Sequence, residues 1–476
     1  MADTEKSSAM GTKPQTELND IERSSGEDHS AKEEKDPNVV DFDGPDDPEN
    51  PMNWSTAKKT VAIAIVSMMT MLSPIGSTIS SAAASDIMAH FHAQNESLEA
   101  FVTTIFLLGY TFGPIAIAPL SELYGRVILY QVCMVLFIIF NVACAVANSL
   151  GSLIVFRLLA GIVGSCPITL GTGSIADMIP REKRAGAMAA YVIGAVFGPS
   201  IGPICGGYLT PAAGWRWNFW LMAIASGVMT VIVFLFLRES YPYVLLKRKT
   251  ERLRKETGNL DLRSALDTGK TPGQLFAFSI WRPLKMLMSP IVLLLSLYAA
   301  VVYSYLYLCF TTFPLIFGGQ YGFGSGASGL ATLGLGVGSL VGVIFCGAAS
   351  DKLSNYLTLK NGGEAKPDEN KTHWIVPIIG TGFLGGGMII TYMASVMYLV
   401  DAYTVYAASV TASNTIFRCL FGALLPLAGG AMYSALGVGW GTSVLGFIAV
   451  AFIPVPVIFY LYGERIRESS LFKVDF

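Results

Sequence analysis

Long apolar stretches dominate this 476-residue chain. Six lie in the first half, at 60–81, 98–120, 127–149, 152–176, 185–209 and 217–237, and five in the second, at 289–317, 328–350, 374–397, 402–433 and 439–462. A helix of about 20 mostly apolar residues crosses a bilayer, where helices and closed barrels alone satisfy their own backbone hydrogen bonds. With 52% hydrophobic and only 14% charged residues, the chain is predicted to be an all-α, multi-pass membrane protein.

Polar segments divide the chain into parts. The first 50 residues hold fifteen Asp/Glu against five Lys/Arg, so 1–57 is predicted to be a disordered tail. A basic segment at 238–288, with the run KRKTERLRK, separates the two halves. We therefore expect a six-helix bundle at 58–237, a linker, a bundle of five apparent helices at 289–463 and a tail at 464–476.

Basic residues orient the spans. Lys58, Arg126, Arg184 and the linker fall on one side of the first eight spans, which the positive-inside rule makes cytoplasmic. The N-terminus is then cytoplasmic, and Asn95-Glu96-Ser97 lies in the first outer loop as a potential glycosylation acceptor at Asn95. Eleven spans would place the basic C-terminal segment GERIRESSLFK outside, against the same rule.

A glycine-proline stretch, GAVFGPSIGPICGG, occupies 194–207. Its small residues recur every three to four positions, so they line one helical face that can pack tightly or kink. The stretch comprises Gly194, Gly198, Pro199, Gly202, Pro203, Gly206 and Gly207. One reading is a bendable helix packed across the boundary between the bundles, limiting leak; the other is simple close packing of helices.

A weak internal repeat indicates a missing helix. PICGG at 203–207 reappears as PLAGG at 426–430, and SELYGR at 121–126 has a fainter counterpart in SDKL at 350–353. SELYGR and SDKL are six spans apart, whereas PICGG and PLAGG are only five spans apart. One span is therefore predicted to be absent between Asp351 and Trp374. The residues there are too polar to cross a bilayer.

These motifs resemble those of the major facilitator superfamily, and within it the fungal drug:proton antiporters. APLSELYGR at 118–126 is similar to the family's loop between helices 2 and 3, although Ala118 and Val127 depart from the usual residues. RLLAG, with Arg157 and Gly161, resembles the helix 4 motif, and the glycine-proline stretch resembles the antiporter motif of helix 5.

The resemblance implies two pseudo-symmetric six-helix bundles, with the missing span at helix 9. A skipped exon, a mis-called intron or a variant isoform would explain the gap, and a natural eleven-span protein is the alternative. The implied function is export of small amphipathic drugs, toxins or secondary metabolites by alternating access, with protons as the coupling ion. A facilitator or importer of the same fold, or a transport-impaired isoform that acts as a receptor or not at all, remains open.

Arg157 and Arg418 are the two charges clearly inside predicted spans. Burying them in lipid would cost a few kcal/mol or more, so both are expected to face the bundle interior, serving either coupling and gating or the fold itself. At the cytoplasmic ends, Glu122, Arg126 and Asp177, with Gly125 in the loop, are expected to form a charge cluster that latches the outward-closed state. Ordinary solvation of helix ends is the alternative.

The aromatic residues of the seventh span suggest a substrate cavity. Tyr303 and Tyr307 are four residues apart, on one face of a helix, and their rings and hydroxyls suit amphipathic molecules; packed or lipid-facing rings are the alternative. No Asp, Glu or His lies near the middle of any span, so proton coupling rests on the resemblance alone.

No residues suggest an enzyme. The four histidines lie outside the middle of the spans, and no H-E-x-x-H motif or nucleophile elbow is present. We expect no catalytic residues, no cofactor and no metal site. The expected partners are a small-molecule substrate, protons and the lipid bilayer of the cell membrane, with no nucleic acid, and the protein is expected to be a monomer.

Overall fold

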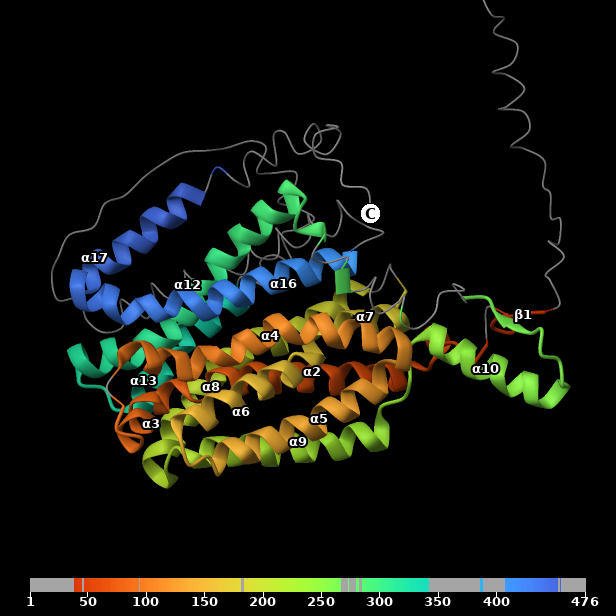
Figure 1. Ribbon diagram of the computed structural model, residues 1–476, viewed down its shortest axis with the longest axis horizontal. Coiled ribbons are helices and arrows are strands. Elements are labelled where there is room, and N and C mark those ends of the chain that lie inside the picture. The colour runs from red at the N-terminus through yellow and green to blue at the C-terminus, as the bar shows by residue number, and fades with distance from the viewer. Residues whose placement is uncertain are drawn as a thin grey trace, which may run out of the picture.

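The computed structural model describes residues 38–44, 47–93, 95–180, 184–266, 285–341 and 407–452, with a few isolated residues elsewhere. These residues are almost wholly helical (Figure 1). The elements of the first half are β1 (Val39–Val40), η1 (Pro51–Asn53), α2 (Thr56–Thr78), η2 (Ser81–Ala83), α3 (Ala84–His90), α4 (Glu96–Tyr124), α5 (Arg126–Ala145), α6 (Leu150–Gly164), α7 (Cys166–Met178), α8 (Arg184–Ala213), α9 (Arg216–Phe236), α10 (Pro242–Thr257) and β2 (Arg263–Ser264). The second half contributes α12 (Pro290–Tyr321), α13 (Ser325–Ala331), α16 (Ala407–Leu424), η5 (Leu425–Ala428) and α17 (Gly429–Phe452).

The long helices cover most of the predicted spans. Among the residues that the structure describes, eight helices are long and apolar enough to cross a membrane, or nine if a pair of helices bent by 117° at Gly437 counts as one span. They include all six spans of the first half, and α6 and α7 together form one of them. Span 374–397, the gap before Trp374 and the tail at 464–476 lie outside the described residues.

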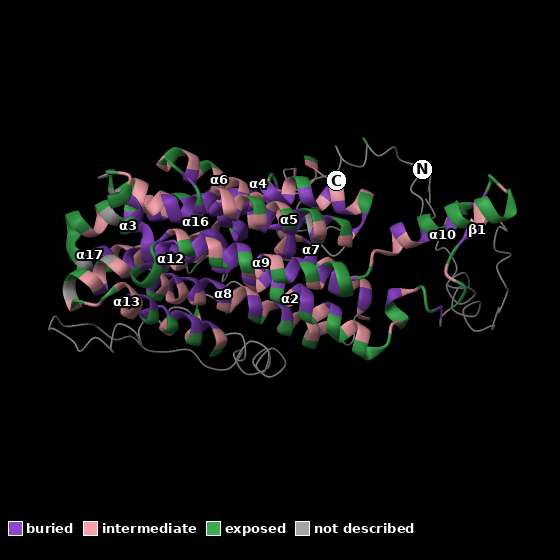
Figure 2. Ribbon diagram, turned by 90° about the horizontal axis from the view of Figure 1, so that it is seen from below, coloured by how far each residue is buried: buried purple, intermediate pink, exposed green. Residues whose placement is uncertain are grey.

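The two ends of the bundle differ in charge. We call the end that carries Arg126, Arg184 and α10 the basic end, and the end that carries α3 the distal end; they lie at the right and left of Figure 1. Apolar side chains on the outside of the helices are exposed, for example Val228 and Leu235 of α9 at 58% and 70% (Figure 2). Such a surface suits lipid rather than water.

Glycines of α8 bring its backbone against α2. A Cβ on Gly198 would lie 2.7 Å from the carbonyl oxygen of Met71, and one on Gly206 would lie 2.1 Å from that of Ile79. Gly194 and Gly202 meet α2 in the same way. These four glycines therefore line the α2–α8 contact within the first bundle, which is the geometry of close helix packing.

The N-terminal segment is folded against the linker. β1 pairs in parallel with β2, and Lys249 of α10, 6% exposed, lies 2.8 Å from Asp43 and 3.4 Å from Asp47. Arg252 contacts Glu49 at 3.1 Å. The expected disordered tail at 1–57 thus differs from the structure over its described part from residue 38, because the acidic segment neutralises the basic run of the linker.

The packing of the tail generates a first prediction. Lys249→Gln leaves the buried Asp47 carboxylate without its cation, so we expect faster amide exchange at Arg263 and Ala265, whose N–H groups donate to Asn38 and Val40. Lys255→Gln, at an exposed position of the same helix, is the control. Unchanged exchange in Lys249→Gln would show that the pairing of β1 with β2 is sufficient to hold the tail.

The same contact should depend on pH in a defined direction. The backbone N–H of Asp43 and then, against the effect of burial, that of Glu49 and the Lys249 ammonium hold the pKa of Asp47 below its usual value. A carboxylate whose pKa is lowered by folding stabilises the folded form at pH values above its unfolded pKa of about 3.9. This contribution to the free energy of unfolding is lost as the pH falls through the folded pKa. Protection should therefore persist between about pH 5 and 8 and disappear in stronger acid.

The α2–α8 contact generates a second prediction. Gly206→Ala forces the α8 and α2 backbones apart, and overpacking of this kind costs about 1–3 kcal/mol, so the melting temperature of the purified protein should fall. Gly227→Ala is the matched control, since its Cβ would meet nothing within 4 Å and alanine favours a helix. Equal melting temperatures for the two variants would contradict the close contact.

Candidate functional site: the basic-end charge cluster and the interface between bundles

Arg126, the first residue of α5, is the centre of a cluster at the basic end. Its Nε lies 3.4 Å from Oδ2 of Asp177 on α7, and both side chains are 15% exposed. Its Nη1 donates to Ser121 Oγ at 2.7 Å, and its guanidinium lies 4.6 Å from the ring centre of Tyr241. The structure therefore brings Arg126 and Asp177 together as the sequence predicted.

Glu239, which follows α9, completes this cluster and was not expected from the sequence. Its carboxylate accepts from the backbone N–H of Arg126 at 3.0 Å and of Val127 at 3.1 Å. The same carboxylate accepts from Ser240 and Tyr241. It thus caps the N-terminus of α5, where a negative charge is favoured, and joins it to the start of the linker.

Gly125 permits this approach. Its φ is +100°, which favours glycine, and a Cβ would lie 2.4 Å from Glu239 Oε2. Glu122 acts on Tyr241 of this cluster: burial and then the charge of Glu122 raise the pKa of the Tyr241 hydroxyl to about 12. A carboxylate directly after the last span of the first bundle was the signal in the sequence that could have identified Glu239.

Arg157 lies inside the first bundle, 2% exposed. Its Nη2 donates to the carbonyl oxygens of Ser77 at 3.0 Å and Thr103 at 3.2 Å, and the rings of Phe106 and Phe219 flank it. It therefore ties the distal end of α2 to α4. These contacts fit the alternative in which Arg157 supports the fold, with its guanidinium bound to carbonyls near a helix end.

Arg418 and the two tyrosines meet at the interface between the bundles. The hydroxyl of Tyr307, on α12 of the second bundle, lies 2.8 Å from Ser77 Oγ on α2 of the first. The guanidinium of Arg418 on α16 lies 4.4 Å from the ring centre of Tyr303, and the rings of Tyr303 and Tyr307 are 5.2 Å apart. The predicted pair thus packs between the bundles, with Tyr307 fully buried.

The two bundles also meet in the distal half of α8. Ser325 Oγ of α13 donates to the carbonyl of Gly207 at 3.1 Å, and Thr332 Oγ1 donates to that of Ser200 at 3.1 Å. A Cβ on Gly207 would lie 2.4 Å from the carbonyl oxygen of Ser325. One face of the glycine-proline helix therefore packs on α2, while Gly207 reaches the other bundle.

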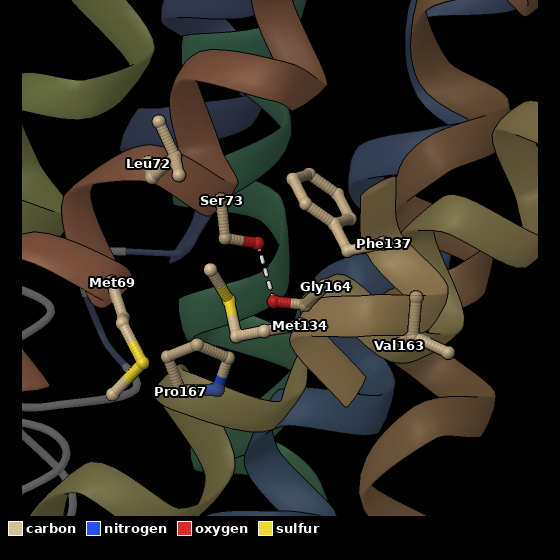
Figure 3. A pocket seen from close by; sticks show the side chains of 8 residues that line it. All are labelled: Met69, Leu72, Ser73, Met134, Phe137, Val163, Gly164 and Pro167. Atoms are coloured by element: carbon tan, nitrogen blue, oxygen red, sulfur yellow. Dashed lines mark hydrogen bonds between the residues drawn. The ribbon is translucent and has the colours of Figure 1, made fainter. Parts of the chain in front are cut away.

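A small cavity lies within the first bundle, among α2, α5, α6 and α7 (Figure 3). Its volume is about 10 Å³, and its eight lining residues are apolar apart from Ser73, which donates to the carbonyl of Gly164. Pockets for drug-sized ligands measure about 300–1,000 Å³. This cavity is too small for such a ligand and does not include Tyr303 or Tyr307.

The remaining expectations concern Asn95 and metals. Asn95 is exposed at the distal end, where its side chain accepts from the Ser97 N–H and caps α4. Among the described residues, no group of three or more His, Cys, Asp or Glu is arranged to hold a metal ion.

The cap on α5 generates a third prediction. Glu239→Ala removes the acceptor of four backbone N–H groups, so we expect a loss of about 1.5–3 kcal/mol, as for hydrogen bonds to a charged group, and faster amide exchange at Arg126 and Val127. Glu239→Gln keeps one oxygen and should fall in between. Glu251→Ala, on the exposed face of α10, is the control, and unchanged exchange in Glu239→Ala would contradict the cap.

Comparison with known proteins identifies the family. Residues 66–363 match the model of the Major Facilitator Superfamily. The chain is 54% identical to the MFS-type transporter penM of Penicillium rubens, over 94% of this chain and 93% of that protein. It is 44% identical to the efflux pump radE of Floropilus chiversii, over 93% and 87%, and 46% identical to the MFS transporter cpaT of Aspergillus oryzae, over 92% and 93%.

Solved structures share the fold. The MFS proton:xylose symporter XylE bound to 6-bromo-6-deoxy-D-glucose superposes with a TM-score of 0.62 over 86% of this chain and 96% of that chain, at 14% identity. XylE from E. coli in a partially occluded inward open conformation superposes with a TM-score of 0.61 over 86% of this chain and 98% of that chain, at 16% identity. The family model and the fungal relatives confirm the predicted resemblance. The chain belongs to the major facilitator superfamily, a family of multi-pass membrane transporters and not of enzymes.

Proposed function

We propose that this transporter exports small amphipathic organic compounds across the cell membrane by alternating access. The observation that carries the proposal is the joining of the two bundles in the distal half, through Ser325 on Gly207 and Thr332 on Ser200. A carrier of this kind must open and close such a contact in each cycle. The name of one relative, an efflux pump, supports export as the direction.

The prolines of α8 suit a contact that opens and closes. Proline has no N–H, so Pro203 and Pro211 leave the carbonyls four residues earlier, of Pro199 and Gly207, without their helical donor. Thr78 of the same bundle donates to Pro199 at 2.9 Å, whereas Ser325 of the other bundle donates to Gly207. Opening the distal end would exchange the second donor for water at small cost.

The basic end is proposed to face the cytoplasm, because it carries Lys58, Arg126, Arg184 and α10. The N-terminus is then cytoplasmic and the distal contact is closed toward the outside. Arg126 and Asp177 are paired in this same arrangement, which supports a role of the cluster with Glu122 as a latch of the outward-closed state. Asn95 would lie outside, where it could carry a glycan.

Proton antiport is proposed for the coupling, on the strength of the family resemblance. Arg157 and Arg418 stay candidates for gating, although Arg157 already donates to three backbone carbonyls through two of its nitrogens. A facilitator or importer of the same fold is the alternative, and uptake rather than efflux in vesicles of known orientation would favour it.

The predicted gap of one helix bears on activity. The alignment with penM runs over 472 positions, while 94% of the 476-residue chain amounts to about 447 residues. About 25 positions of that relative therefore have no counterpart here, which is about one membrane helix. This supports a gap of one span, and sequencing the transcript across codons 351–374 would locate it. If the transcript lacks the span, we expect impaired transport.

A transport assay generates the fourth prediction. The protein is reconstituted with its basic end outward, and three fluorescent amphiphiles are supplied: 8-anilinonaphthalene-1-sulfonate, neutral N-phenyl-1-naphthylamine and cationic rhodamine 6G. We expect at least one to move into an acidic lumen, and Gly207→Leu, which obstructs distal closure, to reduce that movement by tenfold or more.

The control for this assay is Gly227→Leu in lipid-facing α9. Movement that persists after the pH gradient is collapsed would contradict proton antiport, and movement only in the opposite direction would contradict export. If no amphiphile moves with either the wild type or a variant with the missing span restored, the export function is wrong.

A further inference from the structure

The acidic N-terminal segment connects two parts of the molecule that hold Arg126. We call its described residues, 38–44 and 47–54, the strap. At one end η1 contacts α7, the helix that carries Asp177, and Trp54 packs against the apolar core of the first bundle. At the other end β1 pairs with β2 of the linker. The strap therefore runs from the basic end of the first bundle to the linker.

The strap and α10 carry opposite charges. The strap holds Asp41, Asp43, Asp47 and Glu49 and no Lys or Arg, whereas α10 holds six Lys or Arg against two Glu. Besides its two ion pairs, Lys249 donates to the carbonyl oxygen of Asp41 at 3.1 Å. One ammonium group thus meets three oxygens of the strap.

The pair of Lys249 and Asp47 decides the strength of this contact. The Asp43 side chain is 80% exposed, and Glu49 pairs with Arg252 at the surface, so both should contribute little. Lys249 and Asp47 are both buried, and removing one partner of a buried pair leaves a charge without compensation, which is strongly destabilising. A single buried pair therefore keeps the strap on α10.

The position of α10 depends on the strap. Figures 1 and 2 show α10 beyond the basic end of the bundle, with β1 beside it. It contacts α4 of the bundle, and it contacts β1 and β2, which the strap joins. If the strap separated from α10, the helix would lose the neighbours that fix most of its length.

α10 begins directly at the residues that surround Arg126. Tyr241, whose ring lies beside the Arg126 guanidinium, immediately precedes α10, and its carbonyl accepts a hydrogen bond from the Leu245 N–H at 3.1 Å. Glu239, two residues earlier, caps α5. A shift of α10 would therefore move Tyr241 and Glu239 relative to Arg126, while η1 of the strap contacts the helix of Asp177.

We propose that the strap is an electrostatic clamp that keeps the partners of Arg126 in place, with Lys249 and Asp47 as its positioning residues. While the clamp is closed, the start of the linker and α7 hold Tyr241, Glu239 and Asp177 around Arg126. When it opens, the start of the linker moves and the basic end is free to rearrange. This regulatory device does not depend on which compound the protein carries.

The test measures whether a change at the clamp reaches Arg126. Hydrogen–deuterium exchange of full-length Lys249→Gln in lipid nanodiscs is compared with the wild type. We expect the amides of Arg126 and Val127 to exchange about fivefold faster, together with those of Arg263 and Ala265. The N–H groups of Arg126 and Val127 donate to Glu239, which is not part of the strap, so a purely local role of Lys249 would leave them unchanged.

Further variants separate the buried pair from general loss of charge. Asp47→Asn should have the same effect as Lys249→Gln, and the double variant should add little to either, because both remove one interaction. Lys255→Gln, at the exposed surface of α10, is the control and should change exchange by less than about twofold. A melting temperature identifies variants that do not fold, and the milder Asp43→Asn then carries the test at the same four amides.

Each outcome decides the proposal. Faster exchange at Arg263 and Ala265 alone would overturn the positioning role, because the strap would then only hold the linker. Unchanged exchange at all four amides would overturn the clamp itself. Equal effects of Lys255→Gln and Lys249→Gln would also overturn it, since the buried pair would then have no special part. The measurement involves no transport, so either result leaves the proposed export function to its own assay.

Discussion

The absence of water in the bilayer core is the constraint on which the rest of this structure depends. Every backbone polar group there needs a partner within the protein, and α8 shows how this is met. Its glycines let the backbone of α2 approach closely, and hydroxyls of Thr78 and Ser325 reach carbonyls that prolines leave without a helical donor. One of these donors belongs to the same bundle and the other does not.

That difference connects the packing of the helix to its proposed role. The contact with α2 is buried within one bundle and includes a regular row of glycines, so it resists change. The contact with α13 joins two bundles through hydroxyl groups, which water can replace at little cost. A rigid face and an exchangeable face on one helix are what alternating access requires of an element between two moving bodies.

The absence of water in the bilayer core also determines how each charged side chain is paired. At the basic end, where water is available, Arg126 is surrounded by Asp177, Glu239 and Tyr241, and the acidic segment from residue 38 neutralises the linker helix. Within the spans, Arg157 is bound by carbonyls and aromatic rings. Arg418 differs from both because it lies over the ring of Tyr303 at the boundary between the bundles.

The sequence by itself determined the class of fold and the six spans of the first half, because apolar length and loop charge are local properties of the chain. Only the tertiary structure revealed Glu239 as the cap of α5, since that contact joins residues 113 positions apart. It also showed that Arg157 lies inside the first bundle whereas Arg418 lies between the bundles. The packing of the segment from residue 38 against the linker was likewise visible only in the structure. Such outcomes depend on which helices lie side by side, and hydrophobic periodicity fixes the faces of a helix but not its neighbours.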